Sequence, residues 1–196
     1  MRILRHMPAL VAAGVLLAGT LAAGCGGGEE PAPAPSEGNG VGGEETETFE
    51  PQGFDVTFQR PADFEPVPGV EFNRSAGTEP DATAAVGIDD ENLIAVQRFD
   101  LRTRVTDDNL RTVREELDEL FGELAGTPVT GEETEVAGLP AVEYRVELDE
   151  PPDAQTRAVA IFDGRVEYLL NCQSLPDSRD RIEDACELAV DTFRVE

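Results

Sequence analysis

Apolar and polar residues alternate along much of the chain after residue 53, which is the pattern of β-strands with one buried face. The clearest case is 142–148, where apolar residues alternate with charged ones. The dipeptide Asp163-Gly164 separates two such stretches and is typical of a two-residue hairpin turn. Polar residues at 89–92 and the run 138–140 predict two further turns. The predicted strands cover residues 54–58, 70–73, 83–88, 93–101, 132–136, 142–148, 157–162 and 166–172.

Two stretches instead place apolar residues three and four positions apart, which is the spacing of a helix with one buried face. The first is expected to start at a cap formed by Thr106 or Asp107 and to end at Gly126 and Pro128. Its apolar face comprises Leu110, Val113, Leu117, Leu120, Phe121 and Leu124. The second starts near Asp177, and its apolar face comprises Ile182, Cys186, Ala189, Val190 and Phe193. The order of strands, helix, strands and helix predicts an α+β fold, an antiparallel β-sheet flanked by two main α-helices.

The first 24 residues have the pattern of a lipoprotein signal peptide. Arg2 and Arg5 precede an apolar run over 8–23, which is too short to span a bilayer as a helix. The small residues at 22–24 directly precede Cys25, which is similar to a bacterial lipobox. There the cysteine thiol receives a diacylglycerol, and the cysteine becomes the first residue of the mature protein. We therefore expect lipidation of Cys25 and a location on the extracytoplasmic face of the cell membrane; an ordinary cleaved signal peptide or an uncleaved signal anchor are the alternatives.

The segment after this cysteine has the composition of a linker. Residues 25–52 are rich in Gly, Pro and Glu and show no apolar period, so we expect a disordered linker there. A flexible chain of this length spans roughly 30 Å and would hold a folded domain clear of the membrane surface. This leaves residues 53–196 for one α+β head domain.

Charge and composition limit the chemistry that this chain can perform. Acidic residues outnumber basic ones by 41 to 15, the formal charge is −26, and every basic residue is Arg. This charge disfavours DNA, RNA and an anionic lipid surface as partners of the head. The only His is His6, inside the predicted signal peptide, so the mature chain is expected to lack both His and Lys. That excludes histidine-based triads, lysine Schiff bases and histidine metal sites, so we expect no cofactor and no catalysis unless it uses carboxylates alone.

The cysteines predict one cross-link. There are three, and lipidation of Cys25 leaves Cys172 and Cys186 as a pair in an oxidising compartment. A disulfide between these two residues would close a loop and stabilise the folded protein by about 3 kcal/mol. Two free, buried thiols are the alternative.

Acidic clusters and tyrosines are the remaining candidate sites. The clusters at 89–92, 107–109 and 149–153 offer the oxygen ligands that calcium prefers, but none follows the EF-hand pattern. Turn and helix-cap roles account for all three. Tyr144 and Tyr168 each lie on the apolar face of a predicted strand, where a core role is favoured over ligand stacking.

The head resembles the PsbP-like fold as used by actinobacterial lipoproteins of the mycobacterial LpqN type. The similar features are an opening strand that leads to a proline (Phe54 to Pro61), the central helix, and the start of a strand at Gly138 to Tyr144. The C-terminal segment is also similar, with Glu167 to Cys172 followed by Cys186 and Phe193 to Val195. The Trp that often follows the proline is absent, and Phe64 is the nearest aromatic residue. The resemblance implies a central antiparallel sheet between helices and a binding or assembly role, with no catalytic residues to transfer.

Three functions are consistent with these observations. The first is a membrane-anchored, non-catalytic module that binds a protein or another envelope component outside the cytoplasm. The second is a carrier of a small apolar or glycolipid ligand, which would need an apolar pocket of several hundred Å³. The third is a carboxylate-based hydrolase, which would need a cleft with two carboxylates and a raised pKa on one of them.

Overall fold

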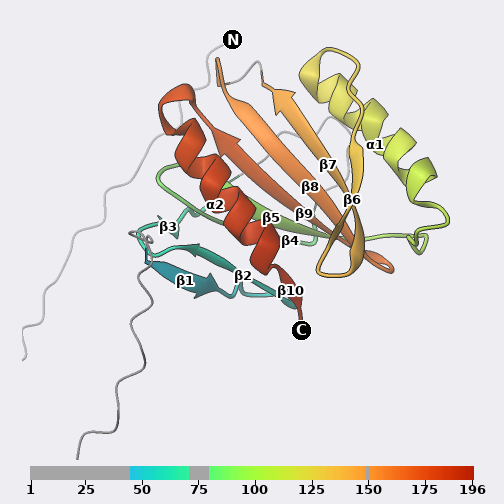
Figure 1. Ribbon diagram of the computed structural model, residues 1–196, viewed down its shortest axis with the longest axis horizontal. Coiled ribbons are helices and arrows are strands. Elements are labelled where there is room, and N and C mark those ends of the chain that lie inside the picture. Colours follow the sequence, from blue (N-terminus) through green and yellow to red (C-terminus); the bar gives the residue numbers. More distant parts are fainter. Residues whose placement is uncertain (1–44, 71–79, 149–150) are drawn as a thin grey trace, which may run out of the picture. The chain divides into compact units, whose positions relative to one another are not determined.

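The computed structural model describes residues 45–70, 80–148 and 151–196, and Figure 1 shows their arrangement. The described residues form an α+β fold with antiparallel strands, which confirms the predicted fold class. The elements are β1 (Thr46–Phe49), β2 (Val56–Pro61), β3 (Glu65–Pro66), β4 (Ala82–Gly87), β5 (Leu93–Asp100), α1 (Leu110–Ala125), β6 (Glu132–Val136), β7 (Leu139–Glu147), β8 (Gln155–Asp163), β9 (Val166–Ser174), a 3₁₀ turn (Pro176–Ser178), α2 (Arg179–Thr192) and β10 (Arg194–Val195).

Two sheets organise these strands. The larger has seven strands in the order β3-β4-β5-β9-β8-β7-β6, and every neighbouring pair is antiparallel. The smaller has the order β1-β2-β10. The hairpins predicted at 89–92 and at Asp163-Gly164 are both present, as β4–β5 and β8–β9. The third turn lies at Ala137 and Gly138, one residue before the prediction, because both residues have the positive φ that a two-residue hairpin requires.

Successive residues of a strand point to opposite faces of the larger sheet, and both of these faces are buried. Val159 and Ile161 of β8 belong to the core between the sheet, α2 and β2, whereas Ala160 and Phe162 belong to the core under α1. Figure 1 shows α2 crossing in front of β8 and β9 and α1 lying beside β6 and β7. The apolar face predicted for α2 is correct: Ile182, Cys186, Ala189 and Phe193 are buried, and Val190 is partly buried.

Helix α1 starts later than predicted. Its first residue is Leu110 and its N-cap is Asn109, so neither Thr106 nor Asp107 caps it. The side-chain oxygen of Asn109 accepts a hydrogen bond from the Thr106 backbone N–H, and its amide donates to the Arg104 carbonyl. These local bonds hold residues 104–109 in a separate turn before the helix begins. The helix ends as predicted, with Gly126 in the left-handed conformation.

A strand lies in the segment predicted to be a linker. Strand β1 lies inside the segment 25–52, which the composition assigned to a disordered linker. Two contacts hold it on β2: Glu47 forms an ion pair with Arg60 at 2.9 Å, and the ring of Phe49 meets that of Phe58 at 5.2 Å. Four residues with one aromatic side chain are too few to give a periodic signal, so this strand could not be recognised within the Gly-, Pro- and Glu-rich segment.

Several predictions fall outside the described residues. These are the signal peptide 1–24, Cys25, the strand residues 71–73 and the acidic pair 149–150. Val70, the first residue of that predicted strand, is described and is not in a strand. Neither helix in the described part of the chain is long and apolar enough to cross a membrane.

Candidate functional site

The disulfide predicted from the cysteine count is present in the structure. Cys172 on β9 and Cys186 on α2 have their sulfur atoms 2.02 Å apart and their Cα atoms 6.0 Å apart. Both residues are buried in the core under α2. The cross-link therefore fastens α2 to the sheet and offers no exposed sulfur for redox chemistry.

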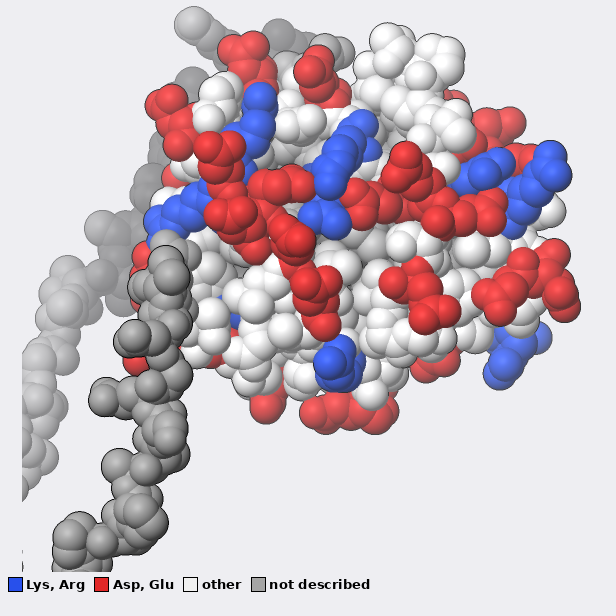
Figure 2. All heavy atoms as spheres, viewed as in Figure 1, with Lys and Arg blue, Asp and Glu red and all other residues white. Residues whose placement is uncertain are grey.

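A network of two Arg and two Glu lies beside α2. Arg145 on β7 and Arg157 on β8 are directly paired across the strands. Arg157 donates to both carboxylate oxygens of Glu143, at 3.1 and 2.9 Å, and Arg145 contacts Glu143 at 3.0 Å and Glu183 of α2 at 2.9 Å. Figure 2 shows acidic and basic side chains lying side by side over this face of the domain. The two arginines and two glutamates neutralise one another, and both oxygens of Glu143 are already occupied.

A small hollow adjoins this network. Arg145 and Arg157 line it together with Thr156, Ser174 and Ile182, and its volume is about 30 Å³. That is room for about one water molecule, and several hundred Å³ is typical of a pocket for a small organic ligand. This hollow is therefore not the pocket that a carrier of apolar ligands requires.

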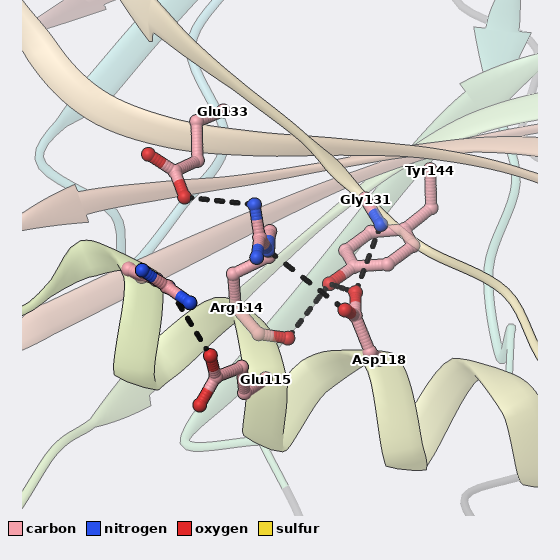
Figure 3. A network of polar contacts seen from close by, with 7 residues as sticks. Arg114, Glu115, Asp118, Gly131, Glu133 and Tyr144 are labelled. Carbon is pink, nitrogen blue, oxygen red and sulfur yellow. Dashed lines mark hydrogen bonds and ion pairs between the residues drawn. The ribbon is translucent and has the colours of Figure 1, made fainter.

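A second polar network joins α1 to the hairpin β6–β7 (Figure 3). The Tyr144 hydroxyl donates to Asp118 Oδ1 at 2.8 Å, and the same oxygen accepts the backbone N–H of Gly131 at 2.8 Å. Arg114 forms an ion pair with Asp118 at 3.8 Å and with Glu133 at 3.0 Å. The ring of Tyr144 stacks on that of Phe121, with centroids 4.2 Å apart. Apart from the ion pair between Arg114 and Asp118 within α1, these contacts fasten the helix to the hairpin and the residue before it, so this network has a structural role.

Both tyrosines are core residues, as the sequence predicted. Tyr144 and Tyr168 are each 2% exposed. Burial is the main cause that raises the pKa of Tyr144 above its ordinary value, and the hydrogen bond to Asp118 raises it further. Burial also raises the pKa of Tyr168. Neither ring is open to a ligand.

Tyr144 should make the protein sensitive to alkali. In the unfolded chain its pKa is about 10, and in the folded chain it is higher, so folding favours the neutral form. The resulting stability is complete below pH 10 and is lost as the pH rises from there toward the folded pKa, by about 1.4 kcal/mol per pH unit. Because the chain has no Lys and only two Tyr, few other groups titrate in this range.

Urea unfolding at pH 9.5, 10.5 and 11.5 tests this expectation. Tyr144→Phe should lose about 1 kcal/mol at neutral pH with its hydrogen bond, but its unfolding free energy should fall less steeply above pH 10 than that of the parent. Equal slopes for the two proteins would contradict the raised pKa.

The acidic turn at 89–92 has a structural role rather than a calcium-binding one. Asp89 Oδ1 accepts the backbone N–H groups of Glu91 and Asn92 at 2.9 and 2.8 Å. Asn92 is 5% exposed, and its side-chain oxygen accepts the Leu175 N–H at 2.9 Å, which joins the turn to the segment before α2. Within the described ranges, no group of three or more His, Cys, Asp or Glu side chains is placed to hold a metal ion.

Sequence reasoning missed a group of arginines at one end of the larger sheet. The backbone N–H of Leu101 donates to the Arg165 carbonyl, and that of Val105 donates to Gly164, both at 2.7 Å. These bonds place the loop after β5 against the tip of the β8–β9 hairpin, so Arg102, Arg104 and Arg165 lie on two adjoining segments, and all three are exposed. We refer to these three residues as the arginine surface. The available sequence signal was the run Arg102-Thr103-Arg104 in a chain with few basic residues.

Comparison with known proteins identifies the fold and not the family. No family model matches the chain, and no curated protein matches it. The solution structure of cyanobacterial PsbP (CyanoP) from Synechocystis sp. PCC 6803 is similar, with a TM-score of 0.52, 13% identity, and coverage of 82% of this chain and 98% of CyanoP. A structure from Bacteroides thetaiotaomicron VPI-5482 has a TM-score of 0.49 and 10% identity over 76% of this chain and 48% of that one. The similarity to CyanoP confirms the predicted PsbP-like fold and extends to the fold alone.

Proposed function

We propose that this protein is a lipid-anchored, non-catalytic binding module that recognises a protein or another envelope component on the extracytoplasmic side of the membrane. The observation that supports this best is that the charged side chains of both polar networks are paired with one another. Arg145 and Arg157 bind Glu143 beside α2, Tyr144 binds Asp118 under α1, and the hollow beside α2 has room for about one water molecule. Recognition therefore belongs to the outer surface of the head.

The hydrolase hypothesis requires two carboxylates that can reach a substrate. Glu183 lines the hollow, and both Glu183 and Glu143 contact Arg145. Glu143 is also held by Arg157 through both of its oxygens. Since Arg145 holds both carboxylates in ion pairs, we do not assign them acid–base roles.

The anchor is tested at Cys25. Cys25→Ala should release the protein from membranes, because the diacylglycerol, which supplies about 0.8 kcal/mol per buried CH₂, can no longer be attached. The measurement is fractionation of cells followed by immunoblotting of the membrane and soluble fractions. Cys186→Ala serves as the control and should stay with the membrane. A Cys25→Ala variant that still sediments with membranes would show that the anchor is a different one.

The partner is tested by crosslinking on intact cells. A photoreactive amino acid is placed singly at exposed positions on different parts of the head, for example Thr103 beside the arginine surface and Asp180 on α2. We expect a discrete crosslinked species from at least one position, which mass spectrometry then identifies. If no exposed position yields more than the background given by the buried position Phe162, the binding function is wrong.

A further inference from the structure

We infer that the arginine surface, formed by Arg102, Arg104 and Arg165, is the docking site for a carboxylate-bearing segment of a partner protein. This inference rests on the proposed binding function and specifies where, and by what chemistry, the partner is held. Three observations support it: the three side chains have no ion-pair partner among the described residues, their loop is fixed in place, and their surroundings select the kind of anion.

The unpaired state of these arginines is unusual in this molecule. Within residues 45–70, 80–148 and 151–196, no Asp or Glu lies within ion-pair distance of the three guanidinium groups. The other described Arg side chains each bind a carboxylate or a backbone carbonyl; even Arg111, whose side chain is 77% exposed, is paired with Glu115. With 41 acidic residues against 15 Arg in the chain, partners are abundant. The three guanidinium groups of the arginine surface are therefore available to an anion from outside this part of the chain.

The loop that presents these side chains is held from both sides. Its backbone is fixed to the hairpin by the hydrogen bonds that the N–H groups of Leu101 and Val105 donate. Val105, which lies in the sequence between Arg104 and the start of α1, is buried. The Arg104 carbonyl also accepts a hydrogen bond from the Asn109 amide at 2.9 Å. The Arg104 guanidinium lies against Gly164, where a Cβ would be only 3.3 Å away. A fixed loop loses little conformational freedom on binding, which favours recognition of a specific ligand.

The neighbouring charges favour a narrow ligand over a flat one. Asp107, Asp108 and Asp163 are exposed on the same loop and hairpin, and Asp100 is already paired with Arg98. A flat anionic membrane would meet these aspartates together with the arginines. A peptide segment with two or three carboxylates can reach the guanidinium groups alone, and the guanidinium fork suits bidentate carboxylate binding.

The test uses the full-length protein in phosphatidylcholine nanodiscs, with hexaglutamate peptide as the probe. Phenylglyoxal modification followed by mass spectrometry reports the reactivity of each Arg separately. We expect the peptide to protect the three arginines of the surface and to leave Arg111 and Arg194 unchanged. By fluorescence anisotropy, the triple variant Arg102→Gln/Arg104→Gln/Arg165→Gln should bind labelled peptide about tenfold more weakly, the value expected for a few exposed ion pairs. The matched control Arg111→Gln should bind as the parent does.

Three results would overturn the inference. Equal protection of Arg111 would indicate unspecific attraction. Stronger protection by phosphatidylglycerol vesicles than by the peptide would indicate a membrane-binding surface. Self-association that the triple variant abolishes would indicate a second copy of this chain as the occupant. Crosslinking separates this inference from the proposed function: a partner captured from Asp180 but not from Thr103 contradicts only the arginine surface, and no partner from any position contradicts both.

Discussion

Removing the cross-link between Cys172 and Cys186 is expected to lower the free energy of unfolding by about 3 kcal/mol, because the bond closes a loop of about 15 residues in the unfolded chain. The double variant Cys172→Ala/Cys186→Ala should therefore unfold at clearly lower urea concentration than the parent. The loss should be largest for α2, since the bond ties this helix to β9. Relative to the parent, the backbone amides of the double variant should show a larger increase in hydrogen-exchange rate in α2 than in α1.

Chemical labelling provides the control for this expectation. Alkylation of the denatured mature protein without reductant should leave both residues unlabelled, and alkylation after reduction should label both. In the folded protein, dithiothreitol should act slowly, because Cys172 and Cys186 are 3% and 0% exposed. Two alkylatable thiols in the protein purified from the envelope would contradict the cross-link, as would a double variant that is as stable as the parent.

Local periodicity explains why most elements could be predicted. The strands β7 and β9 and the helix α2 each repeat an apolar position every two or every three to four residues, and each is long enough for the repeat to be recognised. The pairing of Cys172 with Cys186 followed from counting, since only two cysteines remained after the lipobox. Strand β1 and the start of α1 could not be predicted in this way. A contact with β2 defines β1, and the side-chain bonds of Asn109 define the start of α1.

The candidate site was the least predictable part. Arg102 and Arg165 are far apart in the sequence, and two backbone hydrogen bonds join the loop of the first to the hairpin of the second. Contacts between distant parts of the chain decide whether an Arg forms an ion pair. The sequence shows that the residue is charged but not which residues lie near it. The same applies to Asp118 of α1, because its charge alone does not indicate that it binds Tyr144 and Gly131.

Gly131→Ala is expected to destabilise the protein by about 2 kcal/mol, within the range for overpacking a well-packed core. A Cβ at this position would lie 2.4 Å from Tyr144 Cζ and 2.5 Å from Val142 Cγ1. The ring cannot easily move away, because it stacks on Phe121 and its hydroxyl is bonded to Asp118. The added methyl group must therefore displace the backbone before β6, together with the N–H that Asp118 binds.

Gly122→Ala is the matched control, because it adds the same methyl group to the same helix-and-hairpin unit. Gly122 lies inside α1, and the nearest atom to its Cβ position is the Thr127 carbonyl oxygen at 3.5 Å, an ordinary contact. Replacing a helical Gly by Ala is expected to stabilise the protein by about 0.5–1 kcal/mol. The two substitutions should thus shift the urea midpoint in opposite directions with the same m-value. A Gly131→Ala midpoint at or above that of the parent would mean that α1 and the hairpin β6–β7 are not packed as closely as Tyr144, Asp118 and Gly131 indicate.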